Sequence, residues 1–402
     1  MWARVRWCLK LTRLGTATRF ELAGWYQAGF RLRESKHDSA PSMLTRRALM
    51  AASAVGMASA SAPFSAWSLP ARTMRFPRDH GAHPELRTEW WYITGHARSR
   101  ASDDREFGFQ LTFFRTRVDA TQAMQSKFSA QQLIFAHAAV TDVQGQKLWH
   151  DQRIARAGFG VAVASTQDTQ LKLNDWTLQR DTAEPSRYNA SLPSHDFALQ
   201  LQMNETQPLI LQGQNGLSRK GPESRQASYY YSHPQLRTNG KITLQGQTFD
   251  VAGKAWLDHE WSEELLHPDA QGWDWIGMNL DDGSALTAFR LRTASGGTIW
   301  DGGSFRSAKG ELRVFKRGEV TFTPVRHWTS PLTQARYPVE WQVRTPTAIY
   351  SVKAVIDSQE LDSRSSTGAV YWEGLSDLLD SQGQRVGRGY LEMTGYAAAL
   401  RL

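Results

Sequence analysis

Short runs of strand-forming residues at regular spacing constrain the fold of this chain more than any other feature. Residues 90–96, 107–114 and 133–140 are rich in aromatic and other strand-favouring side chains. Turn-forming pairs such as Asn174-Asp175 and Gln245-Gly246 separate such runs. Because no regular series of helical segments alternates with them, the pattern favours antiparallel sheets over a parallel α/β fold.

The series of strands begins again in the second half of the chain. Residues 273–280 and 285–292 flank Asp281-Asp282-Gly283, a typical β-hairpin turn. Each half is expected to hold roughly eight to ten strands, the number that closes a small ligand-holding barrel. We therefore predict an all-β protein with two antiparallel barrels in tandem, at residues 72–267 and 268–402.

A few local features complete the predicted secondary structure. Residues 126–132 and 260–266 are expected to form short helices, and Asn239-Gly240 is expected to be a turn between strands. The boundary between the barrels is placed near His267-Pro268.

The formal net charge of +8 arises near the beginning of the chain. Residues 1–71 hold 10 Lys and Arg against 3 Asp and Glu, which leaves 37 against 36 for residues 72–402. A nearly neutral body lacks the broad positive field of nucleic-acid-binding proteins, so no nucleic-acid partner is expected. Cys8 is the only cysteine, so no intramolecular disulfide can form.

Residues 43–71 have the composition of a signal peptide. Arg46 and Arg47 precede a small-residue apolar run over residues 48–62, and Ala58-Ser59-Ala60 is a candidate cleavage site. The run is shorter than the ~20 residues that cross a bilayer as a helix. The adjacent arginines indicate the twin-arginine route, so we expect a periplasmic protein.

Residues 1–42 precede this signal and leave two alternatives open. In the first, translation starts at Met43 and residues 1–42 are never made. In the second, residues 1–42 form a basic, aromatic segment that associates with the membrane surface.

Four aromatic and acidic motifs follow one another along residues 75–396. They are Thr88-Glu89-Trp90-Trp91-Tyr92-Ile93-Thr94-Gly95 with the preceding residues 76–87, Tyr229-Tyr230-Tyr231-Ser232, Ala255-Trp256-Leu257-Asp258-His259-Glu260-Trp261-Ser262, and Gly389-Tyr390-Leu391-Glu392-Met393-Thr394-Gly395-Tyr396. Together they resemble the AttH-like and carotenoid 1,2-hydratase family of lipocalin-like secreted proteins. The resemblance implies two lipocalin-like barrels, in agreement with the number of predicted strands.

The motif from Trp256 to Trp261 carries the candidate catalytic residues Asp258, His259 and Glu260. Hydration of an alkene needs a proton donor in a dry pocket, which suits a carboxyl group whose pKa burial raises. A second carboxylate or a histidine would hold the water. On a strand, Asp258 and Glu260 share one face and His259 faces the other side.

The sequence departs from the hydratase branch at one position. By resemblance, the hydratases carry an amide where this chain has Glu260, which weakens the case for hydratase activity. Three roles stay open for the cluster: a structural clasp, ligand binding without turnover, and catalysis. Glu89 is expected to pair with an arginine that closes the base of a barrel, with Arg290 or Arg292 as its partner.

Candidate ligand-binding residues come from the same motifs and their aromatic neighbours. Every second residue of a barrel strand points inward, where large aromatic side chains line an apolar cavity. The candidates are Glu89, Trp90, Trp91, Tyr92, Tyr230, Trp256, Trp261, Trp273 and Trp275.

No metal site is expected from the histidines. His80 and His83 lie near Asp79 in a segment that contains Gly81 and Pro84, which indicates a loop. The sequence has no His-Glu-x-x-His motif, no paired cysteines and no calcium-binding loop.

Two functions therefore remain as alternatives. The first is an exported carrier of a hydrophobic ligand, an isoprenoid or acyl chain. The AttH branch is found with transport systems, which implies an ABC-type permease complex as a partner. The second is a carotenoid hydratase-like hydro-lyase that acts without a cofactor, as the resemblance to that branch implies.

Overall fold

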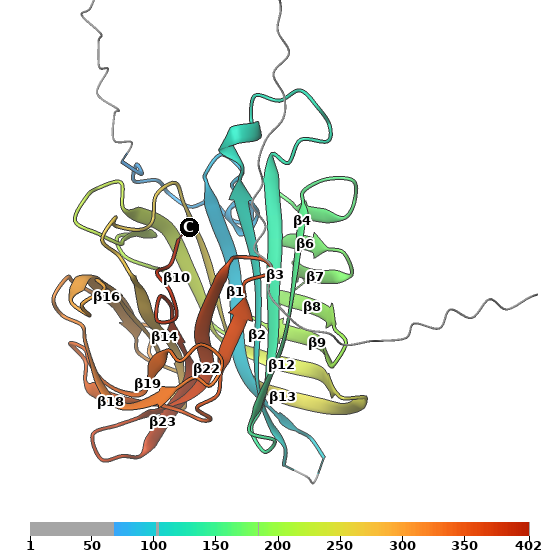
Figure 1. Cartoon of the computed structure of the whole chain (residues 1–402). Coiled ribbons are helices and arrows are strands. Elements are labelled where there is room, and N and C mark those ends of the chain that lie inside the picture. Colours follow the sequence, from blue (N-terminus) through green and yellow to red (C-terminus); the bar gives the residue numbers. More distant parts are fainter. Residues whose placement is uncertain (1–67, 102–103, 184, 402) are drawn as a thin grey trace, which may run out of the picture. The chain divides into compact units, whose positions relative to one another are not determined.

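The computed structural model describes residues 68–101, 104–183 and 185–401, and the predicted leader lies outside them except for its last four residues, 68–71. These residues form an almost entirely β structure within the compact unit Ser65–Leu402 (Figure 1). Among the described residues the helices are two short 3₁₀ turns, Arg78–His80 and Asp119–Thr121. No helix among them is long and apolar enough to cross a membrane.

The first sheet has thirteen antiparallel strands, and its main path runs β4-β3-β2-β1-β13-β12-β9-β8-β7-β6-β5. The short strands β10 and β11 pair with β12. Strands β3 and β4 also contact β6 near the other end of the path, so the sheet curls into a nearly closed barrel. The strands are β1 Thr88–Ser99, β2 Glu106–Arg117, β3 Gln132–Asp142, β4 Lys147–Arg156, β5 Ala162–Ala164, β6 Gln170–Leu173, β7 Trp176–Asp181, β8 Arg187–Pro193, β9 Phe197–Asn204, β10 Ile210–Leu211, β11 Leu217–Arg219, β12 Ala227–Leu244 and β13 Gln247–Ser262.

The second sheet has ten antiparallel strands in the order β17-β16-β15-β14-β23-β22-β20-β19-β18, with β21 paired to β22. The strands are β14 Gly272–Leu280, β15 Ala285–Arg292, β16 Thr298–Arg306, β17 Leu312–Phe315, β18 Thr321–Thr329, β19 Arg336–Arg344, β20 Ile349–Ala354, β21 Glu360–Ser363, β22 Ala369–Leu379 and β23 Arg385–Met393. Each sheet encloses its own hydrophobic core. The prediction of two antiparallel barrels in tandem is confirmed.

The turn at Asp281-Asp282-Gly283 joins β14 to β15 as predicted, and Gly283 has a φ of +91°. The predicted turn at Asn239-Gly240 is wrong, because β12 runs straight through it. Gly240 has a φ of +148°, and a Cβ atom there would lie 2.1 Å from the Gln200 carbonyl oxygen. Glycine at this position therefore allows close strand packing rather than a turn.

The two helices predicted from sequence are also wrong. Residues 126–131 form turns, and β13 continues to Ser262 where the helix at 260–266 was expected. Pairing with β1 and β12 on both sides holds the end of β13 extended. Tertiary pairing therefore overrides the local helical preference.

The two barrels are in direct contact. Gln235 donates to the carbonyl oxygens of Leu280 at 2.9 Å and Ser284 at 2.8 Å, and Asn279 donates to that of Ala255 at 3.1 Å. A separate apolar cluster between the sheets contains Trp256, whose ring lies 6.5 Å from that of Trp275. Contacts of this kind hold both barrels in one compact unit.

Candidate functional site

Strand β13 presents alternating residues to two different environments. Asp258 and Glu260 border a cavity between the two sheets. His259 points the other way, into the first barrel, where its ring stacks 4.5 Å from Trp91. This separation is the one expected from the two-residue period of a strand.

The cavity has a volume of about 660 Å³, which suits a small molecule of moderate size. Side chains of both sheets form its wall, and most of the wall is apolar. Aromatic members of the wall are Trp90, Tyr92, Phe114, Phe135, Trp273, Trp275, Phe289 and Tyr371.

Asp258 is the most strongly hydrogen-bonded carboxyl of the cavity. It accepts from the Tyr230 hydroxyl at 2.7 Å, from the Ser232 hydroxyl at 2.5 Å and from Trp256 Nε1 at 2.7 Å. Burial raises the pKa of Asp258 to about 7, although these three hydrogen bonds oppose the shift. Asp258 can therefore hold or release a proton near neutral pH.

Glu260 lies two residues further along the same face and has a different partner. Its Oε1 atom lies 3.0 Å from Lys220 Nζ and also accepts a hydrogen bond from Ser228. The ammonium of Lys220 in turn lies 4.3 Å from the ring centroid of Phe289 and 4.7 Å from that of Tyr230. The cavity wall thus contains one ion pair framed by aromatic rings.

The second barrel contributes two further carboxyl groups, Glu373 on β22 and Glu392 on β23. They are directly opposite each other in the strand register, so both side chains project from the same face of the sheet into the cavity wall. Burial raises the pKa of Glu373 well above its usual value, and the neighbouring Glu392 adds to the shift. Burial likewise raises the pKa of Glu392 to about 8.

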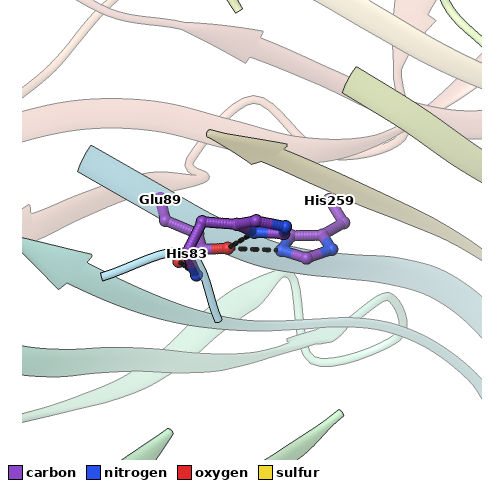
Figure 2. A group of neighbouring side chains, drawn as sticks. All are labelled: His83, Glu89 and His259. Carbon is purple, nitrogen blue, oxygen red and sulfur yellow. Dashed lines mark hydrogen bonds and ion pairs between the residues drawn. The ribbon is translucent and has the colours of Figure 1, made fainter. Parts of the chain in front are cut away.

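Inside the first barrel, Glu89 is the centre of a buried polar network that we call the Glu89 clasp: Asp79, His83, Glu89, Arg115 and His259. Figure 2 shows both imidazoles directed at one Glu89 oxygen, with His83 Nδ1 at 2.7 Å and His259 Nε2 at 2.9 Å. The other oxygen accepts from Arg115 Nε at 2.7 Å and from the His83 backbone N–H at 2.8 Å.

The protonation states of the clasp residues follow from these contacts. Burial disfavours the charge on Glu89, but hydrogen bonds from His259 and His83 outweigh it and lower the pKa of the carboxyl. Burial also disfavours the charged form of His83, yet hydrogen bonds to Asp79 and Glu89 raise its pKa. Burial lowers the pKa of His259 to about 4, so His259 is neutral and donates from Nε2 to Glu89. Its Nδ1 is then free to accept from the Tyr231 hydroxyl at 3.2 Å.

His83, Glu89 and His259 are residue types that could hold a metal ion, and their ligand atoms lie within 4.8 Å of one another. Both Glu89 oxygens already accept two hydrogen bonds each, however. The guanidinium of Arg115 also places a positive charge 2.7 Å from the same carboxylate. These contacts match a charge clasp better than a cation site.

The arginine that pairs with Glu89 is not one of the predicted pair. Arg115 lies opposite Glu89 in the register of β1 and β2, whereas Arg290 and Arg292 approach Asp274 at 2.7 and 3.6 Å. The prediction of Arg290 or Arg292 is therefore wrong. Both arginines instead contact Asp274, which is the acid of the second barrel that corresponds to Glu89.

The predicted site residues divide between the two environments. Asp258, Glu260, Trp90, Tyr92, Trp273 and Trp275 border the cavity. Tyr230 and Trp256 lie behind the cavity wall as donors to Asp258. Glu89, Trp91, His259 and Trp261 lie inside the first barrel, where Trp261 stacks on His83 with ring centroids 3.9 Å apart.

Sequence reasoning missed Lys220, Glu373 and the role of Glu392. A usable signal existed for the two glutamates, because each lies next to or within an aromatic motif, as Asp258 does. Glu373 directly follows Tyr371-Trp372, and Glu392 lies in the last of the four motifs. Lys220 precedes Gly221-Pro222 in a connection between strands, and nothing in that segment marks it.

The fold and the site together define a class of protein: two lipocalin-like barrels that share a cavity lined by aromatic rings and carboxyl groups. The model of the AttH-like family matches residues 68–396, and the chain belongs to this family. A solved AttH structure from Nitrosomonas europaea is 48% identical, covers 82% of this chain and 99% of its own, and superposes with a TM-score of 0.76.

A second solved structure is similar in fold alone. Kievitone hydratase from Nectria haematococca covers 82% of this chain and 97% of its own at 12% identity, with a TM-score of 0.60. A search among curated proteins found no match.

Proposed function

We propose that this protein binds an apolar small molecule, an isoprenoid or acyl chain, in the cavity between its barrels. The observation that carries the proposal is the cavity itself, about 660 Å³ with a mostly apolar, aromatic wall. A cavity of this size and lining suits a ligand with a long apolar body. The carboxyl groups in the wall would orient one polar end of that ligand.

Binding can be tested on the purified native protein even while the ligand is unidentified. A solvent extract analysed by mass spectrometry should contain one apolar compound in near-stoichiometric amount. Ala399→Trp, which narrows the cavity at its wall, should be compared with Glu311→Gln on the exposed surface. The extract should lose the compound only in Ala399→Trp, and equal retention in both variants would contradict the proposal.

The proposal extends to export and transport. The signal-like residues 43–71 support a periplasmic protein, and the resemblance to the AttH branch supports service to an ABC-type permease complex. An apolar ligand needs a carrier to cross an aqueous compartment. Co-purification of a permease with the tagged periplasmic protein would test this partner.

A second candidate function is a hydro-lyase that acts without a cofactor, and one observation favours it. Asp258 has a pKa near 7 and borders an apolar cavity, as a proton donor to an alkene must. The fold shared with kievitone hydratase is compatible with this function. Against it, Glu260 forms an ion pair with Lys220, which the amide of the hydratase pattern would not form.

Turnover separates the two functions. The protein should be incubated with an acyclic carotenoid in ¹⁸O-labelled water and the products analysed by mass spectrometry. We expect unchanged carotenoid, which supports a binding protein. A labelled hydroxyl product that is lost in Asp258→Asn would establish the hydro-lyase instead.

A further inference from the structure

We infer that the ligand of the cavity carries a positively charged nitrogen on its apolar body, and that Glu373 and Glu392 hold this nitrogen. The inference rests on the proposed function, because it assumes that a small molecule enters the cavity. It narrows the ligand from apolar compounds in general to organic cations.

Most of the buried carboxyl groups in the cavity wall have no ion-pair partner among the described residues. Asp258, Glu260 and Glu373 are each at most 5% exposed, and Glu392 is half-buried with its side chain at the cavity. In the described part of the chain, only Glu260 of these four forms an ion pair, with Lys220. Arginines at the cavity border form no ion pair with the other three. Burial holds these three carboxyl groups largely in the neutral form, so a bound cation would be the first counter-ion that they meet.

Unpaired polar atoms point to the same place. The Glu373 Oε1 atom and the Tyr92 hydroxyl are buried and face each other, but their contact falls short of a hydrogen bond of normal geometry, and neither atom has another such partner among the residues that the structure describes. The two side chains come from different sheets and border the same cavity. Because buried polar atoms rarely lack a partner in a native protein, a polar group of the ligand is the expected partner.

The strand register places two carboxyl groups side by side, where one cation could contact both. Glu373 and Glu392 are a directly opposed cross-strand pair, with their Cβ atoms expected at roughly 4.5–5.5 Å. Ionisation of both without a counter-ion is unfavourable, and burial adds to that cost. A cation between them would remove both penalties at once.

Lys220 shows that this wall accommodates an ammonium. Its Nζ atom lies 3.0 Å from Glu260 and within 4.7 Å of the ring centroids of Tyr230 and Phe289. The Glu373 and Glu392 pair has comparable aromatic neighbours, since Trp275 is opposite Glu392 in the register and contacts Tyr92 edge-on at 5.4 Å. A carboxylate combined with aromatic faces is the chemistry that recognises organic ammonium ions.

The test compares three ten-carbon probes that differ in one terminal group: decylamine, decan-1-ol and decanoate. Affinities for the full chain would be measured by quenching of tryptophan fluorescence at pH 7. Decylamine should bind roughly tenfold or more tightly than decan-1-ol, since one charge-assisted hydrogen bond contributes that much. Decanoate should bind most weakly.

Variants then locate the preference. In Glu373→Gln and Glu392→Gln the preference for decylamine over decan-1-ol should disappear. The surface variant Glu311→Gln should retain the full preference. If one of the two Gln variants fails to fold, the other carries this comparison, and equal binding of decylamine and decan-1-ol by the unaltered protein would overturn the inference by itself.

The outcomes distinguish this inference from the proposed function. Equal binding of decylamine and decan-1-ol, or strongest binding of decanoate, would overturn the inference and leave an apolar-ligand carrier intact. A preference for decylamine that survives in both Gln variants would also overturn it. Failure of all three probes to bind would contradict the proposed function itself.

Discussion

Arg115 donates from Nε to Glu89 Oε2 at 2.7 Å directly across strands β1 and β2, and both side chains are shielded from solvent. The second barrel repeats the relationship with Asp274 on β14 and Arg290 on β15, also opposite in register and 2.7 Å apart. Each barrel thus begins with an acid on its first strand and an arginine on its second.

Removal of the Glu89 charge should cost much of the stability. In Glu89→Gln, Arg115 keeps its positive charge in a buried place without the carboxylate that it contacts, and His83 loses a carboxylate that accepts its hydrogen bond. Breaking a buried pair in this way costs about 3–5 kcal/mol. Urea unfolding should show this loss, and the exposed Glu85→Gln should unfold like the parent. A loss below about 1 kcal/mol would exclude the clasp as a major source of stability.

Two adjacent residues of β13 should have separable effects. His259→Ala removes a donor to Glu89 inside the first barrel, so the melting temperature should fall while probe affinity of the folded protein is kept. Asp258→Asn alters the cavity wall, so decylamine affinity should change as well as stability. The two variants would be measured together by thermal melting and fluorescence titration. A reversed pattern would contradict the assignment of faces.

Asp258 should make the protein less stable as the pH rises from about 4 to 7. Burial raises its pKa from 3.8 in the unfolded chain to about 7 in the folded chain. The folded state therefore binds more protons in this window, and the favourable contribution is complete below the unfolded pKa and lost through the folded pKa.

The slope attributable to one such group is at most about 1.4 kcal/mol per pH unit. Urea unfolding of the parent and of Asp258→Asn between pH 4 and pH 8 isolates it, because all other groups are common to both. The free energy of unfolding of the parent should fall relative to that of Asp258→Asn as the pH rises. A constant difference would mean that Asp258 has an ordinary pKa.

Export should depend on the two arginines of the leader. Arg46→Lys combined with Arg47→Lys should abolish export if the twin-arginine route is used. Cell fractionation and N-terminal analysis of the periplasmic parent should find a mature chain that begins between Ala60 and Ala71. Normal export of the double variant would indicate the general secretory route. Residues 1–42 on the exported chain would contradict a start at Met43.

The fold was largely predictable because the strands have a clear two-residue period and strong turn signals. Strand β8 shows this period, since its buried residues Tyr188, Ala190 and Leu192 alternate with more exposed ones. Asn239-Gly240 was misleading because a glycine that permits close strand packing and one that permits a turn look alike in sequence.

The candidate site was predictable only in part. The alternation along β13 correctly assigned Asp258 and Glu260 to one face and His259 to the other. Which arginine meets Glu89 depends on strand pairing, and local sequence does not encode it. The meeting of Glu373 and Glu392 with Asp258 depends on how two barrels pack, so no single motif contains it.

Even-numbered residues of β13 face the cavity, and odd-numbered residues face the Glu89 clasp. A change in the length of this strand therefore cannot alter one of these two sites without altering the other. A one-residue insertion before Asp258 would carry both Asp258 and Glu260 into the barrel interior and His259 into the cavity. The lining of the cavity can therefore change by substitution along one face of the strand and in the connecting loops, but hardly by insertion or deletion within the strand.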